Sequence, residues 1–306
     1  MRPATLRLRA CAKVNLGLEV LGRRADGYHE LRTLFQTIDL HDDVELRLRG
    51  RDIAVRSDHP GVPGDASNLA ARAAEALRRF AGVEQGVEIT LRKRIPVGGG
   101  LGGGSSDAAV VLLGLDRMWR LGLGRAGLLP LARRLGADVP YFLYGGTALG
   151  LGRGDEVYPL ERQLRAWVVV ADPGRAVATA GVFARVATRL TPRENGRTIF
   201  RFVTSDLAGA AAVRGLVNEL EEAALEEAPD LREPVGRIRE VLVAGGAHLA
   251  ALTGSGSACF GVFADGVAAR AASRRLRQQG LRSSLARTVT GSEYRRYWAK
   301  PARRTQ

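Results

Sequence analysis

The residues best suited to chemistry lie in one glycine-rich segment, Gly98–Ser106, in which Gly98–Gly104 places six glycines in seven positions. Glycine adopts positive φ angles freely, so successive backbone N–H groups can form one concave nest for an anion. The helix expected at Asp107–Trp119 would add its unpaired N-terminal N–H groups and its dipole. Two hydroxyls, Ser105 and Ser106, could donate to phosphate oxygens. The segment therefore predicts a polyphosphate site.

Two better-known phosphate loops do not fit this segment. A Walker A motif carries a lysine directly before its hydroxyl residue, and this segment contains no lysine. The spacing of Gly98, Gly100 and Gly103 formally matches a dinucleotide fingerprint. However, Asp116, the acid at about the right distance, falls inside the expected helix instead of ending a second strand. A flexible linker is the remaining alternative, and the position between a strand and a buried helix disfavours it.

Lysine is rare in this chain, which makes the few lysines informative. Of the 46 basic residues, only Lys13, Lys93 and Lys300 are lysine. A compact ammonium persists where the wide planar guanidinium of arginine cannot replace it. Lys13 and Lys93 are therefore candidates for catalysis or ligand binding, whereas Lys300, in a basic tail, has no expected role.

The first half of the chain predicts strands and helices that lead into and out of the glycine segment. Strands show apolar alternation, and helices show apolar residues at helical spacing with a cap or a terminal glycine. Strands are expected at Leu6–Leu21, Thr33–Asp39, Asp43–Arg49, Val87–Arg92 and Tyr141–Leu149, and helices at 69–82 (capped by Asn68), Asp107–Trp119 and Leu128–Leu135.

The second half predicts two helices packed on a small antiparallel sheet. Thr179 is expected to cap a helix that carries Phe183, and residues 191–212 give the weakest pattern. The remaining elements are strands at Trp167–Ala171, His248–Leu252, Ala258–Phe263 and Leu285–Val289, and a helix at Val267–Gln279. Both halves of the chain are thus expected to be α+β.

Length and composition predict a globular protein with two domains. The chain has 306 residues, and about 100–200 residues per domain is usual. Arginines interrupt every apolar stretch near the N-terminus, so no signal peptide is expected. The longest apolar runs, Ala108–Leu113 and Ala166–Ala171, are too short to cross a bilayer. A cytoplasmic protein without membrane contact is the resulting expectation.

The net charge of +14 raises the alternative of a nucleic-acid partner. The arginine pairs are scattered along the chain and are not interleaved with aromatic residues in one patch. Attraction to a phosphate-bearing small molecule explains the sign equally well, and solvated helix faces explain it without any ligand. No nucleic-acid partner is therefore expected.

Four separated segments resemble one family, the GHMP kinases. Ile95–Ala109 resembles the phosphate loop of that family, and the Asp26–His29 segment selects the members that act on a cytidine diphosphate-linked sugar alcohol in isoprenoid precursor synthesis. The similarity covers most of the chain and is weakest over 185–212. The other matching segments are Ala12–Leu18 with Arg24–Leu40, Leu135–Gly146 and Leu252–Phe263.

The resemblance implies an α+β fold of two domains. Residues 1–160 would form an ATP-binding domain like domain 2 of ribosomal protein S5, and residues 161–306 a ferredoxin-like domain. ATP and the sugar alcohol would meet in the cleft between them. The protein would be a monomer or a homodimer.

The resemblance also implies roles for individual residues in transfer of the ATP γ-phosphoryl group to a hydroxyl. Asp138 would accept the hydroxyl proton, and Lys13 would orient Asp138 and stabilise the developing charge. Asn15 would share a strand face with Lys13 and contact the substrate. Without the resemblance, the sequence favours a helix-end or turn acid at Asp138, and Phe183 can be plain helix core. The substrate-binding residues would be Asn15, Tyr28 (stacking on the base), His29 (reading the base edge), Thr179 and Phe183.

The nucleotide side follows from the same resemblance. Asn68 would serve the nucleotide pocket, cap its helix, or do both, and the Gly254–Gly256 turn would close the cleft. Mg²⁺ would be held chiefly by phosphates and water, since no metal-ligating residue is evident. The ATP-binding residues would be Asn68, Lys93, Pro96, Val97, Gly98, Gly99, Gly100, Leu101, Gly102, Gly103, Gly104, Ser105 and Ser106.

Two alternatives remain open at this point. The first is another GHMP kinase, of the homoserine or mevalonate type, although Asp26–His29 and Phe183 argue against an acceptor that carries no base. The second is an RNA-binding protein that uses an S5-like fold and the basic charge, for which Lys13 and Asp138 would be dispensable.

Overall fold

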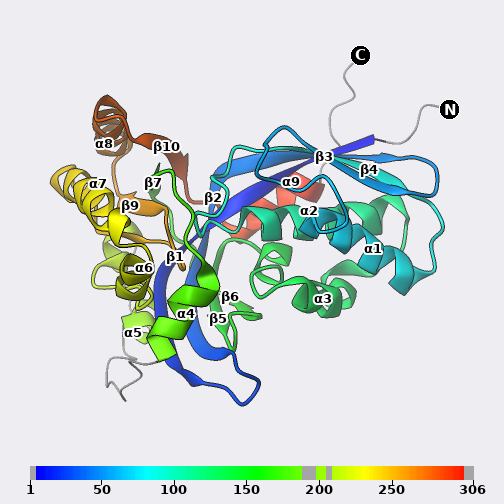
Figure 1. The fold of residues 1–306 in the computed structure, drawn as a ribbon, viewed down its shortest axis with the longest axis horizontal. Coiled ribbons are helices and arrows are strands. Elements are labelled where there is room, and N and C mark those ends of the chain that lie inside the picture. Colours follow the sequence, from blue (N-terminus) through cyan, green and yellow to red (C-terminus); the bar gives the residue numbers. More distant parts are fainter. Residues whose placement is uncertain (1–4, 188–197, 205–208, 300–306) are drawn as a thin grey trace.

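A computed structural model describes residues 5–187, 198–204 and 209–299. Within these residues the strands form two sheets that lie side by side (Figure 1). The six-stranded sheet has the order β3-β4-β2-β5-β6 with β1 paired to β2, and the four-stranded sheet has the order β10-β7-β9-β8. The strands are β1 (Thr5–Arg23), β2 (His29–Leu48), β3 (Ile53–Ser57), β4 (Val87–Arg92), β5 (Thr147–Leu151), β6 (Glu156–Pro159), β7 (Trp167–Asp172), β8 (Leu249–Leu252), β9 (Cys259–Phe263) and β10 (Arg282–Arg287).

The longest element is the antiparallel hairpin of β1 and β2, which runs through both parts of the molecule (Figure 1). The prediction of two strands between Thr33 and Arg49 is wrong, because β2 continues without a break. The polar run at 41–43 does not end the strand, since Asp42 is fully buried and its carboxylate is paired. The register shifts between the pairs Cys11–His41 and Lys13–Thr37, which marks a bulge in β2 opposite the part of β1 that carries Lys13.

Three helices cover one face of the six-stranded sheet: α1 (Leu69–Ala81), α2 (Gly103–Met118) and α3 (Gly124–Leu135). The predicted α1, with Asn68 as its cap and Gly82 at its end, is confirmed. α2 begins four residues earlier than predicted, so Ser105 and Ser106 lie in its first turn. The centre of α2 is buried against the sheet, as its apolar sequence predicts.

The predicted strand Tyr141–Leu149 is wrong over its first half. Residues Tyr141–Leu143 form a 3-10 turn, and β5 begins only at Thr147. Gly145 and Gly146 have φ angles of 64° and 81°, which redirect the chain where a strand would continue. Tyr141 is fully buried and its hydroxyl donates to the Gly146 carbonyl oxygen at 2.7 Å, which fixes this turn.

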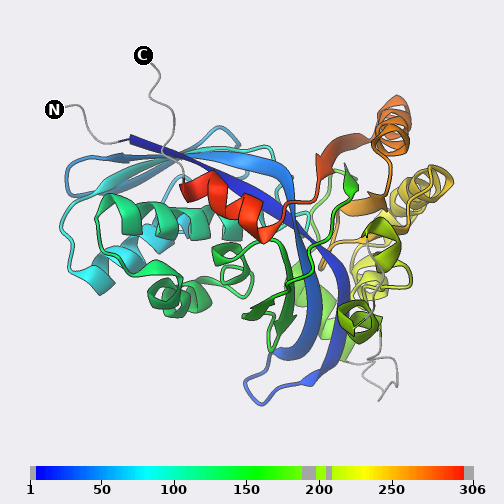
Figure 2. The same ribbon diagram turned by 180° about the vertical axis from the view of Figure 1, so that it is seen from behind.

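Helices pack on the four-stranded sheet, and one further helix returns to β1. Strands β7, β8 and β9 and helix α8 match their predicted ranges within a few residues, whereas β10 begins three residues before the predicted start. The helix α9, which the sequence pattern did not reveal, packs against β1 (Figure 2). The helices are α4 (Thr179–Ala187), α5 (Thr198–Thr204), α6 (Glu221–Glu227), α7 (Arg232–Ala244), α8 (Gly266–Gln278) and α9 (Gly291–Ala299).

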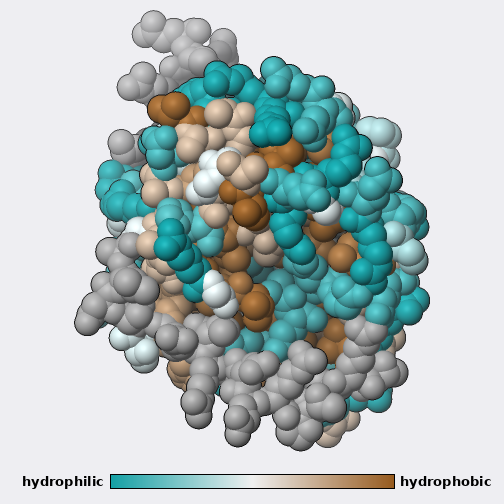
Figure 3. All heavy atoms as spheres, turned by 90° about the vertical axis from the view of Figure 1, so that its left-hand side faces the viewer, coloured by the Kyte–Doolittle hydropathy of each residue, from teal (hydrophilic) through white to brown (hydrophobic). Residues whose placement is uncertain are grey.

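Figure 3 shows the molecule from the side of the four-stranded sheet and its helices. On this face apolar residues are interspersed among hydrophilic ones. The interior of this part of the molecule is formed by buried aliphatic side chains of the helices and of β7–β9. Across the described ranges, no helix combines the length and the apolar character that crossing a bilayer would require. Lys300 and half of the weakly patterned segment 191–212, namely 191–197 and 205–208, lie outside the described residues.

Candidate active site

The glycine segment forms a tight loop that enters α2, and its glycines are required by backbone geometry. Gly98, Gly100 and Gly102 have φ angles of 76°, 76° and 71°. A Cβ atom on Gly100 would lie 2.1 Å from the Thr253 carbonyl oxygen, so no side chain fits there. The loop therefore combines left-handed backbone positions with close approach to a neighbouring strand end, a geometry in which successive amides can form an anion-binding nest.

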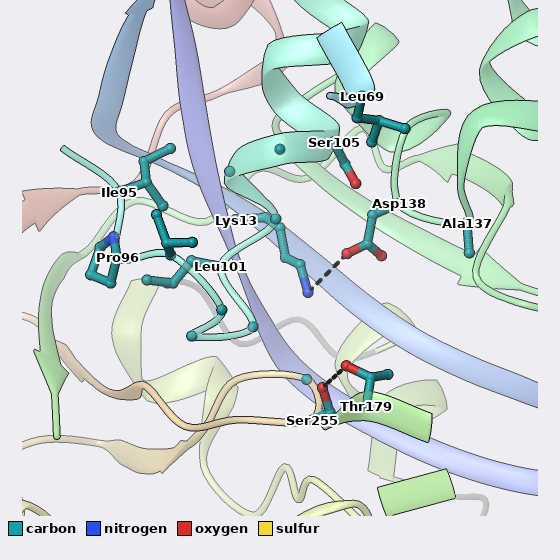
Figure 4. Close-up of a pocket in the computed structure, with 18 of the residues that line it drawn as sticks. Lys13, Leu69, Ile95, Pro96, Leu101, Ser105, Ala137, Asp138, Thr179 and Ser255 are labelled. Atoms are coloured by element: carbon teal, nitrogen blue, oxygen red, sulfur yellow. Dashed lines mark hydrogen bonds and ion pairs between the residues drawn. The ribbon is translucent and has the colours of Figure 1, made fainter. Parts of the chain in front are cut away.

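The loop forms one wall of a cleft of about 570 Å³, a size typical of ligand sites. Figure 4 shows the loop, the Lys13–Asp138 pair and the Thr179–Ser255 contact around one space. The cleft brings together most of the residues singled out from the sequence: Lys13, Asn15, Asn68, Lys93, Pro96, Val97, Gly98, Gly99, Gly100, Leu101, Gly102, Gly103, Gly104, Ser105, Asp138, Thr179 and Phe183.

Lys13 and Asp138 face each other across this space (Figure 4). Lys13 Nζ lies 3.4 Å from Asp138 Oδ2, and the two side chains are 4% and 33% exposed. Lys13 also donates to Asn15 Oδ1 at 2.5 Å, and Asn15 Nδ2 donates to Thr33 Oγ1 at 2.8 Å. A buried ammonium thus fixes one side of a carboxylate whose other side is open to the cleft.

The opposite wall comes from the four-stranded sheet and α4. Thr179 is the first residue of α4, and its Oγ1 lies 2.9 Å from Ser255 Oγ. Thr253 Oγ1 donates to the Gly100 carbonyl oxygen at 3.3 Å, and the Ala258 amide donates to the Gly99 carbonyl oxygen at 3.2 Å. These bonds attach the glycine loop to the second sheet, so both sheets position it.

The two residues of the predicted base pocket lie differently from each other. His29 is 9% exposed and stacks on Phe183, with ring centroids 5.2 Å apart. Tyr28 is 57% exposed, and the Arg153 guanidinium lies 4.9 Å from its ring centroid. Of these four side chains only Phe183 and Arg153 line the cleft itself. Arg153 carried no signal in the sequence beyond being one arginine among many.

The environment of His29 favours its neutral form. Burial, together with the positive charge of Arg23, lowers the pKa of His29. Its Nε2 atom is buried and has no hydrogen-bond partner among the described residues. A neutral imidazole beside an aromatic ring has one donor and one acceptor to offer a ligand.

The ammonium of Lys93 is not free to reach a ligand. It contacts Asp42 Oδ2 and Asp107 Oδ2, both at 2.5 Å, and all three side chains are nearly inaccessible. Burial, with a contribution from the Asp42 charge, raises the pKa of Asp107 to about 7 although Lys93 opposes the shift. Burial acts to lower the pKa of Lys93, but the two carboxylates outweigh it and raise the pKa. Asp42 and Asp107 carried no functional signal in the sequence.

The expected phosphate contact of the Ser106 hydroxyl does not agree with its geometry. Ser106 is fully buried, and its Oγ donates to the Cys11 carbonyl oxygen at 2.7 Å. Its amide donates to Gly102 in the first turn of α2, so neither group is available to the cleft. The pattern of two adjacent serines cannot reveal this, because successive helical residues point about 100° apart.

Asn68 was expected to cap its helix, to contact the nucleotide, or to do both, and the structure bears on the cap alone. Its Oδ1 accepts from the Ala70 amide at 2.9 Å, which confirms the helix cap, and its Nδ2 donates to the Pro63 carbonyl oxygen at 2.7 Å. Asn68 also lines the cleft, and its contact with a nucleotide stays a prediction.

The cleft contains no protein-only metal cage. Within the described part of the chain, no group of three or more His, Cys, Asp or Glu side chains could hold a metal ion. The carboxylates that line the cleft, Asp138 and Asp107, are each engaged by a lysine. This donor set suits a cation that arrives with phosphate and water ligands.

The family models of the GHMP kinases match both halves of the chain: the N-terminal domain model covers residues 68–146 and the C-terminal model residues 207–281. The 4-diphosphocytidyl-2-C-methyl-D-erythritol kinase of Geobacter metallireducens is 44% identical over 88% of this chain and 93% of its own length. The predicted family is therefore confirmed.

Solved structures agree with this result. The structure of a 4-(cytidine 5'-diphospho)-2C-methyl-D-erythritol kinase superposes with a TM-score of 0.74 at 38% identity, over 92% of this chain and 98% of its own. A homoserine kinase from Cytophaga hutchinsonii reaches a TM-score of 0.70 at 20% identity, over 94% of this chain and 95% of its own, which shows a shared fold alone. The predicted α+β GHMP kinase fold is confirmed, and the chain belongs to the GHMP kinases, in the family of 4-diphosphocytidyl-2-C-methyl-D-erythritol kinases.

Proposed function

We propose that this kinase transfers the γ-phosphoryl group of ATP to the 2-hydroxyl of 4-diphosphocytidyl-2-C-methyl-D-erythritol. One observation carries the proposal: the Lys13–Asp138 pair and the glycine loop open into the same cleft. Phosphoryl transfer needs positioned phosphates, stabilised charge and a base for the hydroxyl proton. In this assignment residues 1–160 supply all three, and residues 161–306 supply the facing wall with Thr179, Phe183 and Ser255.

The triphosphate binds to the amides of the loop from Val97 to Gly104 and to the N-terminus of α2, where the helix dipole favours negative charge. The Ser105 hydroxyl, which lines the cleft, donates to a phosphate oxygen. Mg²⁺ bound to the phosphates of ATP would neutralise part of their charge, and no residue is assigned to the ion. Each of these contacts orients the γ-phosphate toward Asp138.

Asp138 accepts the proton of the substrate hydroxyl as the oxygen attacks. It is suited to this because one oxygen is held by Lys13 while the side chain remains one-third exposed to the cleft. Lys13 also stabilises the negative charge that develops on the hydroxyl oxygen and the transferred group. Asn15, bonded to Lys13, is positioned to hold the polyol near the base.

The cytidine base binds at the far end of the cleft, around His29 and Phe183. Phe183, which lines the cleft, offers a stacking surface. His29 packs on Phe183 just outside the lining of the cleft, and the proposal assigns its buried, unpartnered Nε2 to the base edge. Tyr28 and Thr179 complete this pocket in the proposal, with Tyr28 as a second stacking ring. The protein is proposed to act in the cytoplasm as a monomer or homodimer.

An acceptor screen with ATP and Mg²⁺ tests the proposal directly. The purified protein is offered 4-diphosphocytidyl-2-C-methyl-D-erythritol, 2-C-methyl-D-erythritol 4-phosphate, homoserine and mevalonate, and ADP release is measured. Turnover is expected only with the first, because the other three have no base to stack on Phe183. Turnover of homoserine or mevalonate without the cytidylyl substrate would overturn the assignment.

A further inference from the structure

A buried cluster of three charged side chains joins the two ends of the glycine loop. Lys93 lies just before the loop, and Asp107 lies in the helix that follows it. The Lys93 ammonium contacts one oxygen of Asp107 and one oxygen of Asp42, each at 2.5 Å. Asp42 belongs to β2, so the cluster connects both loop ends to the central strand of the sheet.

The loop backbone is attached to the same cluster. Asp42 Oδ1 accepts from the amides of Arg94 and Ile95 at 2.5 Å and 2.9 Å. At the other end, a Cβ atom on Gly103 would lie 3.2 Å from Ile95 Cγ2 and 3.5 Å from Asp42 Oδ2. The start and the end of the loop therefore meet at Asp42.

Stability alone does not explain this arrangement. Taking three charges out of water costs more free energy than burying apolar side chains of the same size. Asp107 Oδ1 is also buried without a hydrogen-bond partner among the described residues, which adds to the cost. Such a cluster is instead suited to fixing one geometry, because directional bonds tolerate less displacement than apolar contacts do.

We propose that Asp42, Lys93 and Asp107 are positioning residues that hold the two ends of the glycine loop at the spacing required to bind the ATP phosphates. This inference rests on the proposed binding of ATP at that loop. The phosphates contact the loop before and during transfer, so loss of the cluster weakens ATP binding equally in both states. KM for ATP then rises while kcat changes little.

Three variants on α2 test the proposal by steady-state kinetics. Asp107→Ala cuts the helix from Lys93, and KM for ATP is expected to rise roughly tenfold or more, since small displacements of binding groups are costly. Asp107→Asn keeps an oxygen for Lys93 and should restore KM to within about threefold of wild type. Val111→Ala, one turn further along the same helix and fully buried, lowers the melting temperature without touching the loop, so its KM should be unchanged.

Hydrogen exchange separates this inference from the proposed function, because it needs no substrate. The amides of 97–104 should exchange faster in Asp107→Ala than in wild type, and not in Asp107→Asn or Val111→Ala. If Asp107→Ala cannot be recovered folded, Asp107→Ser replaces it, since its hydroxyl is too short to reach Lys93.

The outcomes are distinct. Equal KM increases in Asp107→Ala and Val111→Ala, or loop exchange unchanged in Asp107→Ala, would overturn the positioning role. Faster loop exchange in a protein that transfers no phosphoryl group from ATP would leave the positioning role standing and overturn the proposed function.

Discussion

Two of the rare lysines line the same cleft but differ in how exposed their carboxylate partners are. Lys13 faces a single carboxylate that is 33% exposed, whereas Lys93 is enclosed by two carboxylates that are 0% and 3% exposed. The same residue types, lysine and aspartate, thus form two arrangements that are suited to different purposes. An ion pair that is open on one side can exchange protons with a ligand, and one that is closed on all sides can only hold its neighbours in place.

The largest expected effect is on the open pair. Asp138→Asn removes the proposed proton acceptor but keeps the size of the side chain, and we expect kcat to fall by roughly 10²–10⁴. Affinity for ATP, measured by titration calorimetry with a non-hydrolysable analogue, should change by less than about threefold, because the proposed mechanism gives Asp138 a contact with the substrate hydroxyl and none with the ATP phosphates. Wild-type kcat in this variant would exclude Asp138 as the base.

Disrupting the enclosed cluster of Lys93, Asp42 and Asp107 should instead lower the stability of the fold. Lys93→Met leaves two buried carboxylates without a counter-charge, and we expect a loss of about 3–5 kcal/mol in the free energy of unfolding, measured with urea. Lys13→Met is the matched control, since Asp138 can be hydrated, and it should cost clearly less stability while abolishing transfer. If both variants lost the same stability, the proposed difference between the open Lys13–Asp138 pair and the enclosed Lys93 cluster would be wrong.

The third expected effect is a pH dependence of stability that arises from Asp107 in the enclosed cluster. The folded state raises the pKa of Asp107 to about 7, mainly through burial. Folded protein thus retains a proton that unfolded protein releases, so this stability is complete below the ordinary carboxyl pKa and is lost as pH rises through about 7. Asp107→Asn should flatten that decline in urea-unfolding curves measured at several pH values. An identical slope in wild type and variant would contradict the shift.

The smallest effect distinguishes two neighbouring serines in the same way. Ser106→Ala removes a buried hydrogen bond to the Cys11 carbonyl oxygen and should cost about 1 kcal/mol of stability without changing kcat. Ser105→Ala, on the cleft side, should raise KM for ATP with no measurable loss of stability. If Ser106→Ala raised KM for ATP and Ser105→Ala did not, Ser106 would be the residue that contacts the phosphates.

The sequence predicted the site better than the path of the chain. The glycine segment and Lys13 were recognisable because positive φ angles and a point charge restrict the residue type. The Asp42–Asp107 cluster was not recognisable, because acids in a run such as Asp39–Asp43 look like a solvated surface until the strand register buries one of them. Likewise, the turn at Gly145 and Gly146 delays the start of β5 until Thr147, and apolar alternation does not reveal such turn geometry.

The shared packing along β1 and β2 has a consequence for how the protein unfolds. Val14, Leu16 and Ile38 from this hairpin belong to the same buried cluster as Val168 and Phe260 from the four-stranded sheet. Neither sheet can unfold without exposing the other sheet's side of this shared layer. We therefore expect the chain to melt as one cooperative unit, because a fragment cut near residue 160 would leave one side of this apolar layer facing water.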